Sequence, residues 1–372
     1  MSKIKITYII SGIEKARAFE WIVENINPNS YDVSFILLNK KKSFFYNWLK
    51  QRGLKTTFIK QKNSGSLPLI FIKILIQLIK NRPDVVHTHL FDANITGLLA
   101  AKILGIRKRI YTRHHSTYHF EYYPKGIKFD KLCNFLATQI IAISENVRTV
   151  LIQKESVNKN KIILIHHGFD LNEFTNVDER RVELLRNKYS IPKDRKPVIG
   201  VISRQMEWKG IQYIIPAFSE LLKKYPQSYL ILANANGPYK EEINRLIKIY
   251  HIENYVLEIA FENDLFALYK LFDIYVHVPI NGEIEAFGQT YVEALASGIP
   301  SVFTLSGIAK EFIVTEKNAM VVDFCNSSEI VGAIDHIIRD EQLKESIIHQ
   351  GMADVKIFGL KPFIKKLENL YA

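Results

Sequence analysis

Short apolar runs alternate with amphipathic segments along most of this chain. The runs have the Ile and Val content of buried strands, whereas the segments between them carry apolar residues three and four positions apart, as helices do. In the first half, the strand-like runs are Ile4–Ile10, Val33–Leu38, Asp84–His89, Ile110–Thr112, Ile140–Ile143 and Ile162–Ile165. The helical segments are Glu14–Asn25, Ser43–Gln51, Leu69–Lys80, Ala93–Ile103, Phe129–Ala137 and Asn146–Gln153. This alternation predicts a parallel sheet covered by helices on both faces.

The same rhythm restarts after a polar stretch between Asn172 and Arg195, which we interpret as a linker between domains. Further strands are predicted at Val198–Ile202, Tyr229–Leu232, Val256–Ile259, Ile274–Val278, Pro300–Phe303 and Ala319–Val322, and helices at Ile211–Lys224, Lys240–Tyr250 and Gln289–Ser297. The predicted fold is α/β, with two Rossmann-like, doubly wound parallel-sheet domains, 1–175 and 190–355, facing each other across a ligand-binding cleft. A last helix within 356–372 is expected to brace the first domain.

The composition fits a globular protein of two domains. The chain has 372 residues, 47% of them hydrophobic and 24% charged, which is too long for one ordinary core. Its two cysteines, Cys133 and Cys325, are far apart and have no metal-ligand spacing, as expected in a reducing compartment. The N-terminus lacks the pattern of a signal peptide, and the most apolar stretch, Leu67–Ile79, is too short to span a bilayer. We therefore expect a cytoplasmic protein.

The net charge of +12 suggests an anionic partner. Part of it lies between Lys40 and Lys62, where eight Lys or Arg residues alternate with aromatic residues and no acid occurs. This stretch suits an anionic membrane surface, which would make the protein peripheral at the inner face of the cell membrane. It equally suits a solvated amphipathic helix, and both interpretations stay open here. No nucleic-acid recognition motif accompanies the charge, so nucleic acid is not expected as a partner.

The segment from Pro279 to Glu311 carries the strongest candidate chemistry. Glu285 follows a predicted strand, Gly288 falls at the start of the next helix, and Glu293 lies within that helix. A helix N-terminus presents uncapped N–H groups and a positive dipole end to an anion. The backbone of Ala286, Phe287, Gly288 and Gln289 is therefore predicted to surround a diphosphate, with Glu293 placed to accept hydrogen bonds from a ribose diol.

Three further features support a phosphate-binding enzyme. Arg204 and Lys209 follow the first strand of the second half, where they can neutralise a leaving diphosphate. Gly12 follows the first strand of the chain and permits close approach of a ligand to the backbone. Several histidines fall at predicted strand ends, among them His87, His89, His114, His115, His166 and His167. No carboxylate-rich motif accompanies them, so we expect no bound metal and no cofactor, and one of them is expected to bind a sugar hydroxyl.

Taken together, these segments resemble the family 4 glycosyltransferases, also called glycosyl transferases group 1. The resemblance covers nearly the whole chain. It rests on SGIEKA (11–16), PDVVHTH (83–89), YTRHH (111–115), IIAISENV (140–147), KIILIHHGFDLNEF (161–174), SRQMEWKG (203–210) and the pair Glu285 and Glu293, eight positions apart. It implies a GT-B fold and transfer of a sugar from a nucleotide diphosphate-sugar, with retained anomeric configuration and no obligatory metal.

The resemblance also implies roles for single residues. Arg204 and Lys209 match the family's diphosphate-binding pair, Glu285 matches the glutamate near the donor sugar, and Glu293 matches the ribose-binding glutamate. Gly12 matches the turn that faces the donor phosphates. His114 best matches the active-site histidine, although the register leaves His115 open. The second domain is then the nucleotide-sugar domain and the first the acceptor side, with a glycan or lipid-linked acceptor.

Some positions depart from the family pattern. The usual G-x-G-P reads Ala235-Asn236-Gly237-Pro238, the usual Pro-Ser reads Pro279-Ile280, and the glycine pair before Glu311 reads Ser306-Gly307. These departures concern the nucleobase and sugar pockets rather than the reaction class. A covalent double displacement stays open as the chemical route. Alternative functions are another GT-B enzyme, such as a nucleotide-sugar epimerase or a phosphorylase, and a non-catalytic membrane-associated scaffold.

Overall fold

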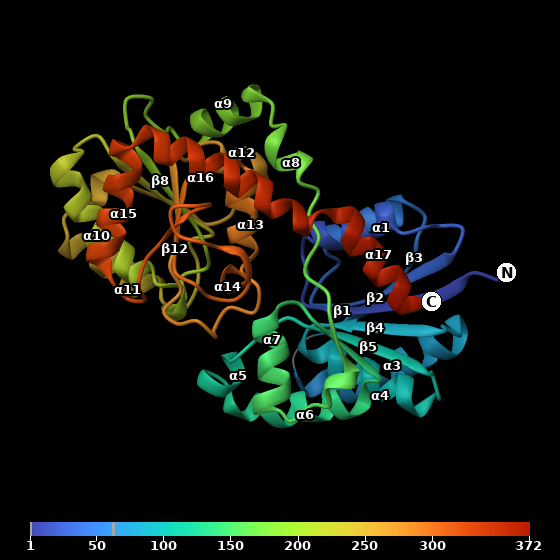
Figure 1. The fold of residues 1–372 in the computed structure, drawn as a ribbon. Helices are drawn as coiled ribbons and strands as arrows, with labels where there is room; N and C mark the ends of the chain where they lie inside the picture. The colour runs from blue at the N-terminus through green and yellow to red at the C-terminus, as the bar shows by residue number, and fades with distance from the viewer. Residues whose placement is uncertain (1, 62–63) are drawn as a thin grey trace. The chain divides into compact units, whose positions relative to one another are not determined.

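The computed structural model describes residues 2–61 and 64–372 (Figure 1). The chain divides into two compact units. Unit 1 comprises Met1–Phe169 together with Phe358–Ala372, and unit 2 comprises Asp170–Ile357. The chain therefore enters unit 2 once and returns to unit 1 for its last helix.

Unit 1 is built on a parallel sheet. Within the described residues the sheet has seven strands in the order β3-β2-β1-β4-β5-β6-β7. They are β1 (Ile4–Ser11), β2 (Tyr31–Asn39), β3 (Lys55–Lys60), β4 (Val85–His89), β5 (Lys108–Arg113), β6 (Gln139–Ala142) and β7 (Ile162–Leu164). Every residue of β4 is buried, and so is β1 from Ile6 onward. Parallel sheets with helices on both faces require such continuous buried runs.

Successive side chains along each strand point to opposite faces of this sheet. Tyr8 and Phe35 stack at 5.4 Å on the face covered by α1, α2 and α17, whose aromatic rings they contact. The next residues, Ile9 and Ile36, enter the opposite core with α3 and α4. The α-helices are α1 (Arg17–Asn25), α2 (Phe44–Gln51), α3 (Leu67–Asn81), α4 (Phe91–Ile103), α5 (Tyr118–Glu121), α6 (Ile127–Leu136), α7 (Glu145–Thr149) and α17 (Leu360–Tyr371). In Figure 1, α17 is the red helix beside α1.

Unit 2 repeats this architecture. As far as the chain is described, its parallel sheet has six strands in the order β10-β9-β8-β11-β12-β13. They are β8 (Val198–Ile202), β9 (Tyr229–Ala233), β10 (Val256–Ile259), β11 (Ile274–His277), β12 (Ser301–Phe303) and β13 (Met320–Val321). The α-helices are α8 (Asn172–Thr175), α9 (Glu179–Lys188), α10 (Ile211–Lys224), α11 (Lys240–Ile249), α12 (Leu265–Tyr269), α13 (Gln289–Ala296), α14 (Ala309–Phe312), α15 (Ser327–Arg339) and α16 (Glu341–Asp354). The prediction of two doubly wound parallel-sheet domains is confirmed.

Each sheet has one point where the strand order reverses. In unit 1 the strands β1, β2 and β3 follow one another toward one edge of the sheet, and the chain then returns so that β4 pairs with the other side of β1. In unit 2 it lays down β8, β9 and β10 and then places β11 beside β8. Loops leave such a switch point on opposite faces of the sheet, so ligands bind there, beyond the carboxyl ends of the strands. The segments after β1, β4, β8 and β11 are therefore where function is expected.

Two predictions about local structure were wrong. One of the two interpretations of the stretch between Lys40 and Lys62, a single solvated helix, was wrong, because the stretch contains α2, close to the predicted Ser43–Gln51, and also the edge strand β3, of which only Ile59 is buried. Lysine on exposed edge strands is common because it discourages pairing with other chains. The supposed linker between Asn172 and Arg195 contains α8 and α9, and Arg181 on α9 forms an ion pair with Asp264, so this segment belongs to unit 2.

Candidate functional site

In unit 2, the loops after β8 and β11 bring together a lysine and a glutamate. Lys209 ends the short 3₁₀ turn Glu207–Lys209, and its Nζ donates a short hydrogen bond to Oε1 of Glu285. His277, the last residue of β11, has its Nε2 3.4 Å from the same oxygen. Two predicted site residues that are 76 positions apart in the chain therefore meet at the switch point of this sheet.

A glycine makes this meeting sterically possible. Gly210 has φ 75°, and a Cβ added to it would lie 1.8 Å from the carbonyl oxygen of Val278. Only glycine lets the turn after Lys209 approach the loop after β11 so closely. A backbone hydrogen bond of 3.1 Å from Ile280 to Trp208 joins the same two segments. The position of Lys209 beside Glu285 is thus fixed by backbone packing as well as by charge.

The charge state of the pair follows from its surroundings. Burial alone would raise the pKa of Glu285, but the Lys209 ammonium and His277 hold that pKa well below its usual range, so the carboxylate is ionised. Burial lowers the pKa of His277, which is therefore neutral at pH 7. Arg204 lies five residues before Lys209, is exposed, and forms no ion pair with any residue that the structure describes. Its positive charge is available to an anionic ligand.

The N-terminus of α13 has the properties of an anion site. Gly288 is its N-cap, with φ 80°, and neither a capping side chain nor an acidic residue in the first turn offsets the helix dipole. The loop before it is held in place, because Ile308 donates a 2.9 Å backbone hydrogen bond to Phe287 and Ser306 accepts one of 3.3 Å from Glu285. Of the predicted backbone donors, Ala286 and Phe287 lie in this buried loop, whereas Gln289 is exposed at the tip.

Glu293 occupies a different environment from Glu285. It lies one turn further along α13, where Tyr269 donates a 2.9 Å hydrogen bond to its Oε2. Burial raises the pKa of Glu293 to about 7, and the hydrogen bond from Tyr269 offsets only part of that effect. No cation pairs with Glu293 among the residues described. At neutral pH its carboxyl is therefore near half protonation, and groups that donate hydrogen bonds to it will favour the ionised form.

In unit 1, the segment after β1 is open to a ligand. Gly12 has φ 65°, and a Cβ added there would meet no atom within 4 Å. The turn is anchored by a 2.8 Å backbone hydrogen bond from Gly12 to Leu38 and by the side chain of Asn39, which bonds both the N–H and the carbonyl of Ile13. The positive φ explains the glycine, and the empty space beside it agrees with the predicted approach of a ligand.

His114 lies near this switch point and is paired with His89 at the end of β4. Nδ1 of His89 is 3.0 Å from Nε2 of His114, while Nε2 of His89 is buried and unpaired among the described residues. Burial, with smaller contributions from neighbouring imidazoles, lowers the pKa of both rings well below 6.5, so each carries one proton. Buried N–H groups are rarely left unpaired, so His89 carries its proton on Nδ1 and donates to His114. His114 then has its proton on Nδ1 and is a hydrogen-bond donor there.

His115, the alternative to His114, belongs to another cluster. The ligating atoms of His115, His119 and Asp130 lie within 4.8 Å of one another, a spacing that could hold a metal ion. The carboxylate of Asp130 already accepts hydrogen bonds from both imidazoles and from the buried Arg113, which also pairs with Glu155. A buried guanidinium requires such partners. The cluster is therefore accounted for as the ion-pair network of Arg113, and the absence of a bound metal stays a prediction.

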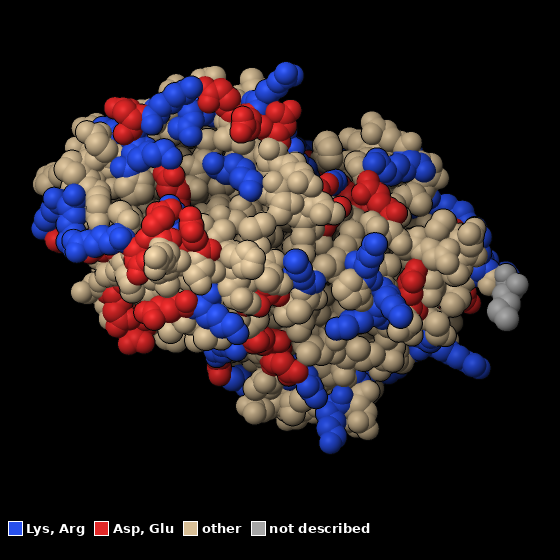
Figure 2. Space-filling model, turned by 45° about the horizontal axis from the view of Figure 1, so that its top comes forward, with Lys and Arg blue, Asp and Glu red and all other residues tan. Residues whose placement is uncertain are grey.

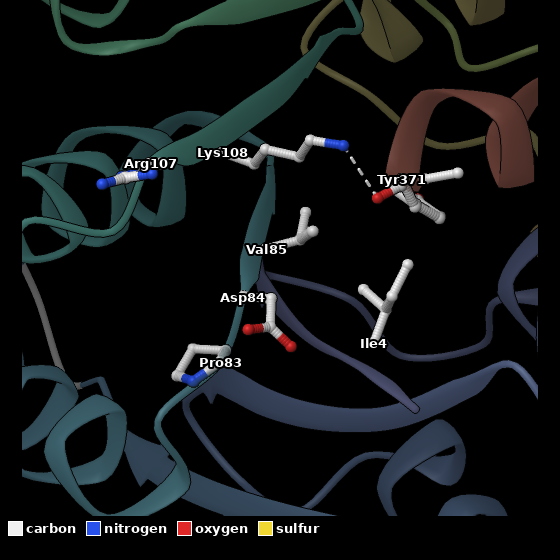
Figure 3. Close-up of a pocket in the computed structure, with 8 residues that line it drawn as sticks. Ile4, Pro83, Asp84, Val85, Arg107, Lys108 and Tyr371 are labelled. Atoms are coloured by element: carbon white, nitrogen blue, oxygen red, sulfur yellow. Dashed lines mark hydrogen bonds between the residues drawn. The ribbon is translucent and has the colours of Figure 1, made fainter. Parts of the chain in front are cut away.

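A pocket of about 370 Å³ opens elsewhere in unit 1. Figure 3 shows it lined by Ile4, Val85 and Lys108, the first residues of β1, β4 and β5, with Lys108 donating a 2.9 Å hydrogen bond to the carbonyl of Tyr371. It therefore lies at the amino ends of the strands, the edge opposite to Gly12 and His89. Doubly wound sheets bind their ligands at the carboxyl ends, so this pocket is not the candidate site.

Comparison with known families agrees with this arrangement. The model for glycosyl transferases group 1 matches residues 182–353, and the model for glycosyltransferase family 4 matches residues 23–173. The first match falls in unit 2 and includes Lys209, Glu285 and Glu293, and the second covers most of unit 1 and includes His114, whereas Gly12 lies before it. The chain belongs to glycosyltransferase family 4. The predicted resemblance is confirmed, and the enzyme is a glycosyltransferase of the GT-B fold.

Individual relatives are distant but cover most of the enzyme. It is 26% identical over 310 residues to the capsular polysaccharide biosynthesis glycosyltransferase CapM of Staphylococcus aureus, covering 81% of this chain and 79% of the relative. It is 24% identical over 326 residues to the alpha-monoglucosyldiacylglycerol synthase of Acholeplasma laidlawii, covering 82% and 79%. Its fold matches the crystal structure of Anabaena Alr3699/HepE in complex with UDP and glucose, with TM-score 0.84, 21% identity and 98% coverage of both chains.

Three residues of the candidate sites were missed by the sequence analysis. His277 contacts Glu285, Tyr269 donates to Glu293, and Ser306 holds the loop at Glu285. His277 could have been found from its place at the carboxyl end of a predicted strand next to the switch point. Tyr269 could not, because it lies in a short helix far from any motif. His89 lies at a strand end as predicted, and its Nε2 has no partner in the described part of the chain.

Proposed function

We propose that this glycosyltransferase is retaining and metal-independent, and that it transfers a sugar from a nucleotide diphosphate-sugar to an acceptor hydroxyl. The observation that carries the proposal is the Lys209–Glu285 pair beside the uncapped N-terminus of α13, at the switch point of unit 2. Support for the donor class comes from solved structures of the same fold that contain UDP with glucose, or UDP-glucose.

The proposed donor site uses each residue according to its charge. The diphosphate lies against the backbone of Ala286 to Gln289 at the tip of α13, where the helix dipole and the N–H groups of the first turn of α13 favour an anion. Arg204 supplies an exposed guanidinium that forms no ion pair with the described residues, and Lys209 shares its ammonium between Glu285 and the diphosphate. Glu293 accepts hydrogen bonds from the ribose diol. Glu285 remains ionised near the donor sugar, where it accepts hydrogen bonds from hydroxyl groups.

The proposed reaction breaks one bond and forms one. The bond between the anomeric carbon and the β-phosphate oxygen breaks, and its electron pair stays on the phosphate oxygen. The acceptor oxygen bonds to the anomeric carbon from the same face, and its proton passes to the departing phosphate. Arg204, Lys209 and the helix tip bind the diphosphate more tightly as its charge grows, and that difference lowers the barrier. Because these groups neutralise the leaving group, the proposed chemistry needs no metal.

Unit 1 is proposed to supply the acceptor side. His114, held by His89 as the Nδ1–H tautomer, donates a hydrogen bond to a sugar hydroxyl and does not act as the general base. Gly12 leaves the space that the donor phosphates require. The acceptor is proposed to be a glycan or lipid-linked hydroxyl in surface polysaccharide or glycolipid assembly at the cytoplasmic side of the membrane. The names of two relatives, a capsular polysaccharide enzyme and a glucolipid synthase, support this class.

A two-stage experiment tests the proposal. A thermal-shift screen with nucleotide diphosphates and their sugars identifies the donor, because a ligand that binds the folded state raises the melting temperature. Transfer from that donor to glycan and lipid acceptors is then followed by proton NMR in the presence of EDTA. The expected product has the same anomeric configuration as the donor. An inverted product, or activity that EDTA abolishes, would overturn the proposal, and conversion of the donor without any acceptor would indicate an epimerase.

A further inference from the structure

Helix α3 exposes an apolar face that none of the described residues of unit 1 covers. Leu69, Ile72, Ile76 and Ile79 are 57%, 51%, 45% and 56% exposed. Their spacing of three, four and three residues places them on one side of the helix. Isolated exposed aliphatic residues are ordinary, but four in a row form a continuous apolar stripe. The opposite side of α3 is buried in the core of unit 1 through Ile70, Ile74 and Leu78.

Two lysines stand beside this apolar stripe. Lys73 lies four residues after Leu69, and Lys80 lies four residues after Ile76, so both border the stripe on the exposed side of the helix. α3 contains no acidic residue. A flexible lysine stem can lie along an apolar surface while its ammonium reaches the charged layer above it.

The stretch of sequence that contains α3 carries charge of one sign. No Asp or Glu occurs between Asp32 and Asp84, whereas that segment contains nine lysines and two arginines. It comprises most of β2 together with α2, β3 and α3, which form the outer edge of the unit 1 sheet. Figure 2 shows Lys and Arg lying among Asp and Glu on one face of the molecule. The edge of unit 1 that carries the apolar stripe is therefore complementary to an anionic surface.

The aromatic residues of α2, which lies on the other face of the sheet, are not the membrane-facing group. Phe45 and Trp48 are buried against the sheet side of that helix, and Arg52 lies over the Trp48 ring at 3.7 Å. Of the four aromatic residues from Phe44 to Trp48, only Phe44 is exposed, with Tyr46 half-buried. The basic residues of the 40–62 stretch thus remain at the surface, but the apolar part of an interfacial site lies on α3.

We propose that the apolar stripe of α3, with Lys73 and Lys80, docks this enzyme on an anionic lipid bilayer. α3 has 15 residues and is about 22 Å long, which is too short to cross the hydrocarbon layer of about 30 Å. None of the helices in the described residues has the length and hydropathy of a membrane span. An amphipathic helix of this kind lies in the plane of the interface, with its apolar side among the acyl chains and its lysines at the headgroups. The proposal concerns binding alone and does not depend on the proposed reaction.

Vesicle sedimentation tests this proposal. The wild-type enzyme is expected to sediment with vesicles of phosphatidylglycerol and phosphatidylcholine and to remain in solution with phosphatidylcholine alone. The Ile72→Ser/Ile76→Ser variant should bind at least tenfold more weakly, and Lys73→Glu/Lys80→Glu should lose the preference for anionic vesicles. Ile249→Ser is the matched control, because Ile249 is also 51% exposed but lies on α11 of unit 2. Circular dichroism melting confirms that each variant is folded.

The outcomes are separable. Equal sedimentation of wild type and the Ile72→Ser/Ile76→Ser variant, or no sedimentation of the wild type, would overturn the proposal. A wild-type dimer that becomes a monomer in this variant, measured by light scattering without lipid, would show that a second copy of the chain covers the stripe instead. Binding to zwitterionic and anionic vesicles alike would remove the role assigned to Lys73 and Lys80.

Discussion

Replacing Glu293 by Gln separates two roles of one buried carboxyl. Burial raises the pKa of Glu293 from 4.5 to about 7, so between these pH values the folded protein holds a proton that the unfolded chain has released. The stability of the fold therefore falls as pH rises from about 4.5 to 7 and stays low above that range. A pKa displacement of this size corresponds to about 3 kcal/mol of unfolding free energy. Glutamine has nearly the same shape, carries no charge, and can still accept the hydrogen bond from Tyr269.

The expected result is a variant that is more stable but binds the donor less well. In urea unfolding at pH 8, Glu293→Gln should exceed wild type by up to about 3 kcal/mol, and at pH 4 the difference should vanish. Glu345→Gln, an exposed change on α16, is the control and should be neutral at both pH values. Equal stability of Glu293→Gln and wild type at pH 8 would refute the claim that burial of the Glu293 carboxyl raises its pKa and destabilises the fold.

Binding measurements then test the ribose role of the same residue. If the ionised carboxyl accepts hydrogen bonds from the ribose diol, wild-type affinity for the nucleoside diphosphate should fall about tenfold between pH 8 and pH 6, as Glu293 takes up a proton. The Glu293→Gln variant should bind more weakly at pH 8 and show only the pH dependence of the phosphate itself. Unchanged affinity in this variant by calorimetry would remove Glu293 from the ribose site while leaving its effect on stability intact.

Three further predictions concern the other candidate residues. Lys209→Ala should lower kcat by about 10²- to 10³-fold, because an electrostatic contact to the leaving group is lost. Lys209→Arg, which keeps the positive charge, is the control, and a near-normal kcat of Lys209→Ala would contradict this prediction. Gly210→Ala should lower the free energy of unfolding, measured in urea, by at least about 1–3 kcal/mol, because the added Cβ would clash with the carbonyl of Val278. Gly332→Ala is the control: Gly332 has open space around it in α15, so this variant should be neutral or stabilising. His89→Ala should lower kcat about tenfold with little change in KM, and it should alter the ¹⁵N NMR shifts of the His114 ring. If the ¹⁵N spectrum of the wild type shows His114 protonated on Nε2, the tautomer assignment is wrong.

Much of the fold was predictable because its signals are local. Buried parallel strands such as Val198–Ile202 and Tyr229–Ala233 are continuous apolar runs, and α10 was predicted with the bounds that the structure shows. The edge strand β3 was missed because a strand with one buried residue and lysines at both ends carries no such run. α9 was missed because its sequence is mostly polar and only Leu185 is buried, so its place depends on contacts with α12 that the local pattern does not encode.

The sequence predicts which residues form the candidate site better than it predicts their charge states and contacts. The pairing of Lys209 with Glu285 follows from two motifs at neighbouring strand ends. The different charge states of the two glutamates do not follow from the sequence, because they depend on whether a cation or only a tyrosine faces each carboxyl. The choice between His114 and His115 likewise required coordinates, since adjacent residues after β5 turn toward His89 in one case and toward Asp130 in the other.

The measurement that tests the central claim most directly compares two ligands by calorimetry: the nucleoside diphosphate selected by the thermal-shift screen and its monophosphate. The second phosphate is assigned to Arg204, Lys209 and the tip of α13, and charged hydrogen bonds of this kind are each worth about 1.5–3 kcal/mol. Wild type should therefore prefer the diphosphate by about 100-fold or more, and the Arg204→Ala/Lys209→Ala variant should lose most of that preference. Equal affinity of wild type for both ligands, or a preference that survives in the double variant, would contradict the account.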